Sequence, residues 1–315
     1  MSRAVALTVF AFAAILATGA QAADQVRIGK PSAIDFYFSI QDVGVTAGIF
    51  KKYDLEIQTV SLDGSGKLHQ ALTADSVDIG LGSGTDLAFI AKGAPEKAVA
   101  NMAGPPVNMY VLVSEKSGIK TIADLKGKRM GVSTMGSLTY WLATELSRRQ
   151  GWGDTGFQIV TAGNVQAEAA GFVSGELDAA VASLEAGLTM AEKGQGRPLV
   201  SFGELVPTFM VHTFFATNNM MTKHPDVLRR YLKAWFETVA YAKAHKTETI
   251  KFSQPITRLS DAAAAKDYDV ITPTLSDDGR FDPKAIDVML KSLVDMGQLD
   301  KLPAAKDLYT EEFLK

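Results

Sequence analysis

Short apolar segments alternate with helical segments from Val26 onward, and this order limits the possible folds more than any other feature of the sequence. The expected strands of a first unit are residues 26–29, 55–60, 77–80 and 98–102, and those of a second unit are 109–113, 129–132, 158–161 and 179–182. Such alternation favours the α/β class with mostly parallel sheets flanked by helices. A length of 315 residues fits two domains of about 150 residues each.

Helical patterns dominate the last hundred residues. His224-Pro225-Asp226 indicates a helix start with proline in the first turn, and residues 283–296 indicate another helix with Gly297 as its C-terminal cap. We expect these helices to pack on the first unit. The predicted domains are therefore lobe 1, residues 23–108 plus 216–315, and lobe 2, residues 109–215. The two crossings, near 103–110 and 211–217, would form a hinge.

The two units resemble each other at a spacing of 100 residues. Residues 71–83 align with residues 171–183, so that Asp78 and Asp178 both precede a strand, and Ser83 and Ser183 both end one. Thr85 and Glu185 then fall at equivalent positions at the start of the next helix. Two related lobes facing each other would bring these strand ends to one cleft.

The N-terminus predicts export. An apolar block at residues 4–17 follows Ser2-Arg3 and precedes Ala20-Gln-Ala22, the small-x-small pattern of a cleavage site. The block is shorter than the roughly 20 residues of a membrane anchor, so we expect residues 1–22 to be the cleaved signal peptide of an exported protein. With no cysteine in the chain, a disulfide, a thiolate metal site and a lipid-modified cysteine are all excluded.

Catalytic and nucleic-acid signals are weak. The net charge is −3 and no basic stripe carries aromatic residues, so nucleic acid is not an expected partner. The four histidines form no zinc motif, and no serine has the flanking glycines of a nucleophile elbow. The run Gly80-Leu-Gly-Ser-Gly-Thr85 departs from the dinucleotide fingerprint at its third glycine position. We expect no enzyme, no metal and no cofactor.

Three predicted helix starts supply candidate ligand contacts. Residues 124–137 indicate a turn, a strand and then a helix opening at Ser137, which places free backbone N–H groups at the carboxyl end of a strand. The candidates at the three starts are Gly64 and Ser65; Ser83, Gly84 and Thr85; and Thr134, Gly136 and Ser137. Their backbone and hydroxyl donors suit a carboxylate or sulfonate, although ordinary helix capping also explains each serine and threonine.

Side chains from other loops complete the candidate set. Asp35, Phe36 and Tyr37 follow the first strand, and the two aromatic rings could stack on a planar ligand or pack in the core. Tyr110 lies at the first crossing and could do the same or fill the hinge. Glu185 would need a donor partner if it faced the cleft; the alternative places it, with Asp86, at the surface near the positive end of a helix. His212 could donate to a carboxylate or serve a structural role.

Four segments together resemble a known family. These segments are Val77-Asp-Ile-Gly80, residues 121–131, Ser174-Gly-Glu-Leu-Asp-Ala-Ala180 and His224-Pro-Asp226. They are similar to the periplasmic solute-binding proteins of ABC importers for sulfonates, nitrate, taurine and thiamine pyrimidine precursors, over nearly all of the chain from Val26. The resemblance implies a type II, two-lobed venus-flytrap fold that traps a ligand between lobes. Eukaryotic relatives that make the thiamine pyrimidine share a cysteine-rich motif, which this chain lacks.

The resemblance implies a substrate-binding component of an ABC importer. Its ligand would be a small organic solute, anionic and possibly aromatic, such as a sulfonate, a carboxylate or a pyrimidine-like molecule. The expected partners are the permease and its ATPase in the inner membrane, and the chain itself is expected to be a monomer. The alternative is a secreted ligand sensor that docks on a membrane receptor.

Overall fold

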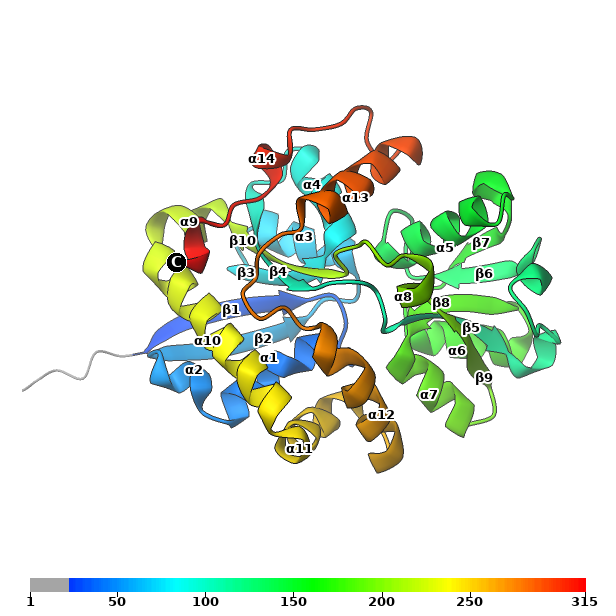
Figure 1. Ribbon diagram of the computed structural model, residues 1–315, viewed down its shortest axis with the longest axis horizontal. Helices are drawn as coiled ribbons and strands as arrows, with labels where there is room; N and C mark the ends of the chain where they lie inside the picture. Colours follow the sequence, from blue (N-terminus) through cyan, green and yellow to red (C-terminus); the bar gives the residue numbers. More distant parts are fainter. Residues whose placement is uncertain (1–22) are drawn as a thin grey trace, which may run out of the picture.

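The protein consists of two α/β lobes that lie side by side (Figure 1). The structure is a computed structural model that describes residues 23–315, so the expected signal peptide, residues 1–22, lies outside the described residues. In the described part of the chain, no helix combines the length and apolar character needed to cross a bilayer.

The first sheet contains five strands in the order β2-β1-β3-β10-β4. Their bounds are β1 (Asp24–Lys30), β2 (Leu55–Ser61), β3 (Ile79–Ser83), β4 (Glu96–Ala103) and β10 (His212–Thr217). β1 runs parallel to β2 and β3, whereas β10 runs antiparallel to both β3 and β4. Four strands therefore point one way, and their carboxyl ends share one edge.

The second sheet repeats this arrangement in the order β7-β6-β8-β5-β9. Its strands are β5 (Met109–Ser114), β6 (Arg129–Val132), β7 (Gln158–Thr161), β8 (Ala179–Ser183) and β9 (Gly196–Ser201). β6 is parallel to β7 and β8, and β5 is antiparallel to β8 and β9. Both sheets are thus mostly parallel with one reversed strand, as the alternating pattern predicts.

Helices cover the faces of both sheets (Figure 1). Those of lobe 2 are α5 (Leu138–Arg149), α6 (Val165–Ser174), α7 (Leu184–Glu192) and α8 (Phe202–Leu205). Those of lobe 1 are α1 (Phe36–Thr46), α2 (Ile49–Lys52), α3 (Ser65–Thr73), α4 (Leu87–Ala91), α9 (Asn218–Lys223), α10 (Pro225–Ala244), α11 (Lys246–Thr257), α12 (Asp261–Ile271), α13 (Pro283–Asp295) and α14 (Ala305–Leu308).

The C-terminal helices pack on lobe 1. The Tyr231 hydroxyl of α10 donates to Gln41 of α1 at 2.8 Å, and Arg230 donates to the Tyr53 carbonyl at 2.8 Å. Pro225 occupies the first turn of α10, and Gly297 follows α13 with a φ of 68°, a left-handed conformation that favours glycine. Lobe 1 is therefore built from two separate parts of the sequence.

The second crossing lies earlier than the sequence suggests. β10 begins at His212 and pairs with β3 and β4, so residues 212–215 belong to the first sheet and not to lobe 2. The chain crosses from lobe 1 to lobe 2 between β4 and β5, at residues 104–108, and returns between α8 and β10, at residues 206–211. The apolar run that forms β10 is a central strand, whereas the sequence suggested a connection.

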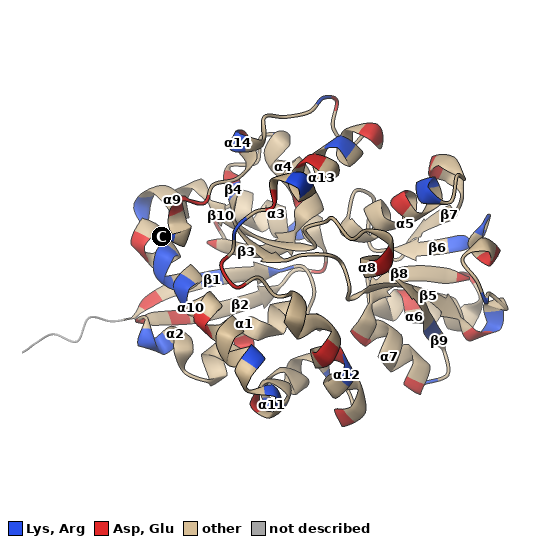
Figure 2. Cartoon of the chain, in the orientation of Figure 1, with Lys and Arg blue, Asp and Glu red and all other residues tan. Residues whose placement is uncertain are grey.

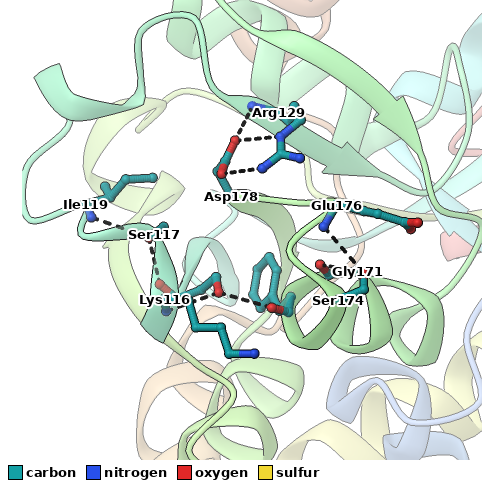
Figure 3. Close-up of polar contacts among 10 residues, drawn as sticks. Lys116, Ser117, Ile119, Arg129, Gly171, Ser174, Glu176 and Asp178 are labelled. Carbon is teal, nitrogen blue, oxygen red and sulfur yellow. Dashed lines mark hydrogen bonds and ion pairs between the residues drawn. The ribbon is translucent and has the colours of Figure 1, made fainter.

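The internal repeat corresponds to an arginine–aspartate interaction that occurs once in each lobe. Asp78 accepts the backbone N–H of Arg27 at 2.8 Å and its guanidinium at 2.6 and 3.1 Å. Asp178 accepts the backbone N–H of Arg129 at 3.0 Å and its guanidinium at 2.7 and 2.9 Å (Figure 3). Each aspartate thereby ties the turn before β3 or β8 to the neighbouring strand at the point where β3 or β8 begins.

Candidate functional site

A cavity of about 220 Å³ lies between the two lobes. Lobe 1 contributes residues from the loops after β1 and β2, the end of β3 and His212 at the start of β10. Lobe 2 contributes Met109, residues of the loop and helix after β6, the first turn of α6, and the end of β8. Both sheets therefore present the carboxyl ends of their parallel strands to one cavity, where open α/β sheets commonly bind ligands.

Six helix starts converge on this cavity. The residues that cap these helices all belong to its lining, and they are Asp35, Gly64, Ser83, Ser137, Asn164 and Ser183. Three caps come from each lobe. Because backbone N–H groups are free at a helix start and the helix dipole is positive there, this geometry favours oxygen-rich groups on a ligand.

A hydroxyl network surrounds the start of α5. The Ser137 hydroxyl donates to the Thr134 carbonyl at 2.7 Å and accepts the Tyr140 N–H at 3.3 Å. Ser133 donates its hydroxyl to Ser137 at 3.0 Å, and the Thr139 hydroxyl lies 2.9 Å from that of Ser137. Ser133, Ser137 and Thr139 all line the cavity, so three hydroxyl groups lie close together at this helix start.

The charges at the cavity are acidic. Asp35, Asp63 and Glu168 belong to its lining, and within residues 23–315 no lysine or arginine does. Figure 2 shows that the basic residues of lobe 2 gather at its outer end, around β6, β7 and β9. An anionic ligand would therefore be held by hydroxyl and backbone donors, because the lining offers it no ion pair.

His212 is neutral at physiological pH. Burial lowers the pKa of His212 to about 4, and its ring lies between Tyr37 and Phe38, with centroids 4.9 and 4.7 Å away. Its Nδ1 lies 3.3 Å from the Gly82 carbonyl, and its Nε2 lies 3.8 Å from Asp35. Asp35 itself is 6% exposed, and burial raises its pKa to about 6.

Glu185 lies behind the cavity and joins the two lobes. Glu185 is fully buried, as is Asp86, so the alternative that placed both at the surface is wrong. Glu185 accepts the backbone N–H of Phe36 at 2.7 Å, and Asp86 accepts the backbone N–H and hydroxyl of Ser83 at 2.9 and 2.8 Å. These hydrogen bonds satisfy Asp86 and Oε1 of Glu185, whereas Oε2 of Glu185 has no hydrogen-bond partner within residues 23–315. Burial raises the pKa of Glu185 to about 8, and nearby Asp35 raises it further.

The structure separates the candidate residues into two groups. Those in the cavity lining are Asp35, Gly64, Ser65, Ser83, Ser137 and His212. Those outside it are Phe36, Tyr37, Gly84, Thr85, Tyr110, Thr134, Gly136 and Glu185. Several residues of the second group contact neighbours of the cavity lining without reaching the cavity themselves.

Individual contacts explain the second group. Phe36 packs edge-on against Tyr268, and the Tyr37 hydroxyl lies 2.5 Å from that of Thr274. The Thr85 hydroxyl lies 3.0 Å from that of Ser83. A Cβ on Gly84 would lie 2.2 Å from the Met210 carbonyl oxygen, so glycine permits the second crossing to approach the end of β3.

Several lining residues were not among the candidates. Asn164 and Ser183 cap α6 and α7 after strands, and the rule that selected Ser83 and Ser137 would also have selected them. Glu168 lines the cavity with 2% exposure, but a glutamate in a helix carries no sequence signal of burial. Across residues 23–315 no three His, Asp or Glu side chains are placed to hold a metal ion.

Comparison with known protein families identifies the family to which this chain belongs. The family described as NMT1/THI5 like matches residues 36–249, which is more than half of the sequence. The chain belongs to the NMT1/THI5-like family. A putative thiamine biosynthesis protein of Haemophilus influenzae is 26% identical to this NMT1/THI5-like protein over 206 residues, 64% of this chain and 63% of that protein. The chain thus spans less than two thirds of the length of this relative.

Solved structures share the fold of this NMT1/THI5-like protein. The alkanesulfonate-binding protein SsuA of Xanthomonas axonopodis pv. citri, bound to MOPS, is 19% identical, has a TM-score of 0.76 and covers 91% of this chain and 98% of its own. The desulfurization enzyme DszB is 15% identical, has a TM-score of 0.66 and covers 92% of this chain and 97% of its own. The predicted two-lobed periplasmic binding protein fold is confirmed.

Proposed function

We propose that this NMT1/THI5-like protein is the periplasmic substrate-binding component of an ABC importer and captures a small organic solute between its lobes. The observation that supports this most is the convergence of six helix starts, three from each lobe, on one interlobe cavity. A site divided between lobes suits trapping by closure, because the ligand contacts both halves only when they are together. The likeness in fold to a sulfonate-binding protein points the same way.

The cavity favours a solute with an oxygen-rich acidic group. Ser83, Ser137 and Ser183 present hydroxyls at helix starts, and the backbone N–H groups beside them are natural partners for a carboxylate or sulfonate. Apolar walls from Phe38, Met109 and other residues accommodate an aromatic or aliphatic body. A cavity of about 220 Å³ limits the solute to a small molecule.

A thermal-shift screen tests this function. A solute that binds only the folded protein adds about 2.7 kcal/mol to stability at one hundred times its Kd, so the melting temperature rises. The panel contains aliphatic and aromatic sulfonates, aromatic carboxylates and pyrimidines. The absence of a shift with every class contradicts the proposal.

Ser137→Asp tests the role of the α5 helix start. Aspartate also caps helices, so the fold is kept while a negative charge enters the cavity. Thr217→Asp is the matched control, because Thr217 caps α9 and lies outside the cavity lining. We expect Ser137→Asp to abolish binding of an acidic solute found in the screen and Thr217→Asp to retain it. Equal affinity in the two variants contradicts an oxyanion site at α5.

Two other functions have distinct outcomes. A secreted ligand sensor predicts a neighbouring gene for a sensor kinase, whereas import predicts neighbouring genes for a permease and an ATPase. The likeness in fold to DszB raises the possibility of turnover, which incubation of the protein with each bound solute tests directly. Recovery of the unchanged solute supports binding without catalysis.

A further inference from the structure

Glu168 is a buried acid in the wall of the cavity. It belongs to the first turn of α6, and its side chain is 2% exposed. Its Oε2 is fully buried and has no hydrogen-bond partner among residues 23–315. Burial alone raises the pKa of Glu168 to about 8, since no neighbouring charge or donor lowers it.

Three other buried acids near the cavity each accept at least one hydrogen bond from the protein. Asp35 accepts the backbone N–H of Tyr37 at 2.9 Å, Glu185 accepts that of Phe36, and Asp86 is held by Ser83 and His69. Asp63, the remaining acid of the lining, is exposed to solvent. Within residues 23–315, Glu168 is therefore the buried acid of the cavity lining whose side chain makes no hydrogen bond. Oε2 of Glu185 and both carboxyl oxygens of Asp267 also lack partners, but these residues lie outside the lining.

A carboxyl group in this state destabilises the protein unless something else satisfies it. Burying a polar group without a hydrogen bond is unfavourable, because the group loses its contacts with water and gains no partner in the protein. The position of Glu168 on the cavity wall means that a bound solute can supply the missing donor. The start of α6 also favours a negative charge there, so the acceptor form of the carboxyl is stabilised once a donor is present.

We propose that Glu168 is a specificity-determining residue that accepts a hydrogen bond from an N–H donor of the solute, such as an amine, an amide or an amino group on an aromatic ring. This inference rests on the proposed solute-binding function and refines its substrate class. The solute then carries two kinds of group: an oxyanion for the helix starts and an N–H donor for Glu168.

Matched pairs of probes test the inference. Each pair differs by one amino group: 4-aminobenzoate with benzoate, and 4-aminobenzenesulfonate with benzenesulfonate. Affinities are measured by calorimetry for the wild type, for Glu168→Leu and for Glu176→Gln. Glu176 is the control because it is exposed and follows the same helix. We expect the wild type and Glu176→Gln to bind the amino member of at least one pair about tenfold more tightly.

Glu168→Leu is expected to bind both members of that pair with the same affinity. Its melting temperature is a second readout. Replacing an unpartnered buried carboxyl by an apolar group of similar size keeps or raises the melting temperature, whereas removing a structural carboxyl lowers it. A preference for the amino member that survives in Glu168→Leu, or a variant that is markedly less stable, overturns the inference.

The outcome also separates this inference from the proposed function. If the wild type binds the two members of every pair equally, or binds only solutes without an amino group, the role of Glu168 is wrong and solute binding stands. If the wild type binds none of these probes and none of the wider panel, both proposals fail.

Discussion

Glu185 and Phe36 are 149 residues apart in the sequence, and the carboxyl of Glu185 accepts the backbone N–H of Phe36 at 2.7 Å. Glu185 lies in α7 of lobe 2 and Phe36 begins α1 of lobe 1, so this buried hydrogen bond connects the lobes directly. Ser260 also donates to Glu192, at 2.5 Å, across the same side of the interface. The described arrangement of the lobes is thus held by polar contacts as well as by apolar packing.

Removal of the Glu185 carboxyl should favour separation of the lobes. Glu185→Ala deletes the acceptor of the Phe36 N–H, while Glu185→Gln keeps an acceptor oxygen and serves as the matched control. Because one such hydrogen bond contributes about 0.5–1.5 kcal/mol, we expect Glu185→Ala to weaken solute binding about two- to tenfold. Small-angle scattering should show a larger radius of gyration for unliganded Glu185→Ala than for Glu185→Gln. Identical radii and affinities would contradict this role.

Stability should decrease as pH rises from 5 to 9. Burial raises the pKa values of Glu168 and Glu185 to about 8 from an ordinary 4.5, so the folded protein binds more protons than the unfolded chain between these values. The stability that these groups contribute is fully present below pH 4.5 and is lost as pH rises through 8. Melting temperatures measured at intervals of one pH unit check this, and the decline should be shallower in Glu168→Leu and Glu185→Gln. A melting temperature that rises over this range would contradict the prediction.

His69 should be essential for stability. Its Nδ1 lies 2.6 Å from Glu96 and its Nε2 lies 3.1 Å from Asp86, and all three side chains are buried. Asp86 and Glu96 raise the pKa of His69 to about 9 against the opposing effect of burial, so the histidine is charged at pH 7. His69→Ala leaves two buried carboxylates unpaired and should cost about 3–5 kcal/mol.

Urea unfolding measures this loss for His69. His224→Ala is the control, since His224 is exposed and makes no side-chain cap. The folded pKa of His69 lies above its ordinary value of 6.5, so its contribution is present below pH 6.5 and is lost as pH rises through 9. Equal free energies of unfolding for the two variants would mean that the buried cluster is not stabilising.

The repeated arginine–aspartate pairs should contribute comparably to the two lobes. Asp78→Asn and Asp178→Asn each weaken three hydrogen bonds to an arginine, and we expect each to cost about 1–3 kcal/mol. Asp226→Asn is the control, because the Asp226 side chain is 90% exposed and pairs only with Arg229 at 3.4 Å within the described chain. Denaturant unfolding compares the three variants. If only one of Asp78→Asn and Asp178→Asn lowered the free energy of unfolding, the two pairs would not be equivalent.

Local patterns in the sequence predict much of this fold. Eight of the ten strands, the cap at Ser137 and the helix start at Pro225 follow from periodicity and capping chemistry. β9 contains Gly196 and Pro198, which locally argue against a strand, and its pairing with β5 in lobe 2 overrides that preference. The neighbours of β10 lie more than a hundred residues earlier, so no local pattern could assign it to the first sheet.

The residues that line the cavity are harder to predict from the sequence than the strands are. Caps at strand ends are local features, and for this reason Ser83 and Ser137 were foreseeable. The orientation of an aromatic ring or an acid depends on distant segments. Phe36 packs against Tyr268, and Glu168 is buried in the wall of a cavity that both lobes line, two facts that only the folded chain contains.

The position of β10 between β3 and β4 has a consequence for the order in which the protein folds. All strands of lobe 2 lie between residues 109 and 201, so they precede β10 along the chain and can pair before it is available. Lobe 1 must wait, because β3 and β4 lack their shared neighbour until Thr217 has been synthesised. β1 can pair with β2 and β3 before then, but the edges of β3 and β4 that face β10 stay unpaired longest. An unpaired strand edge is the state most exposed to aggregation and most useful to a chaperone.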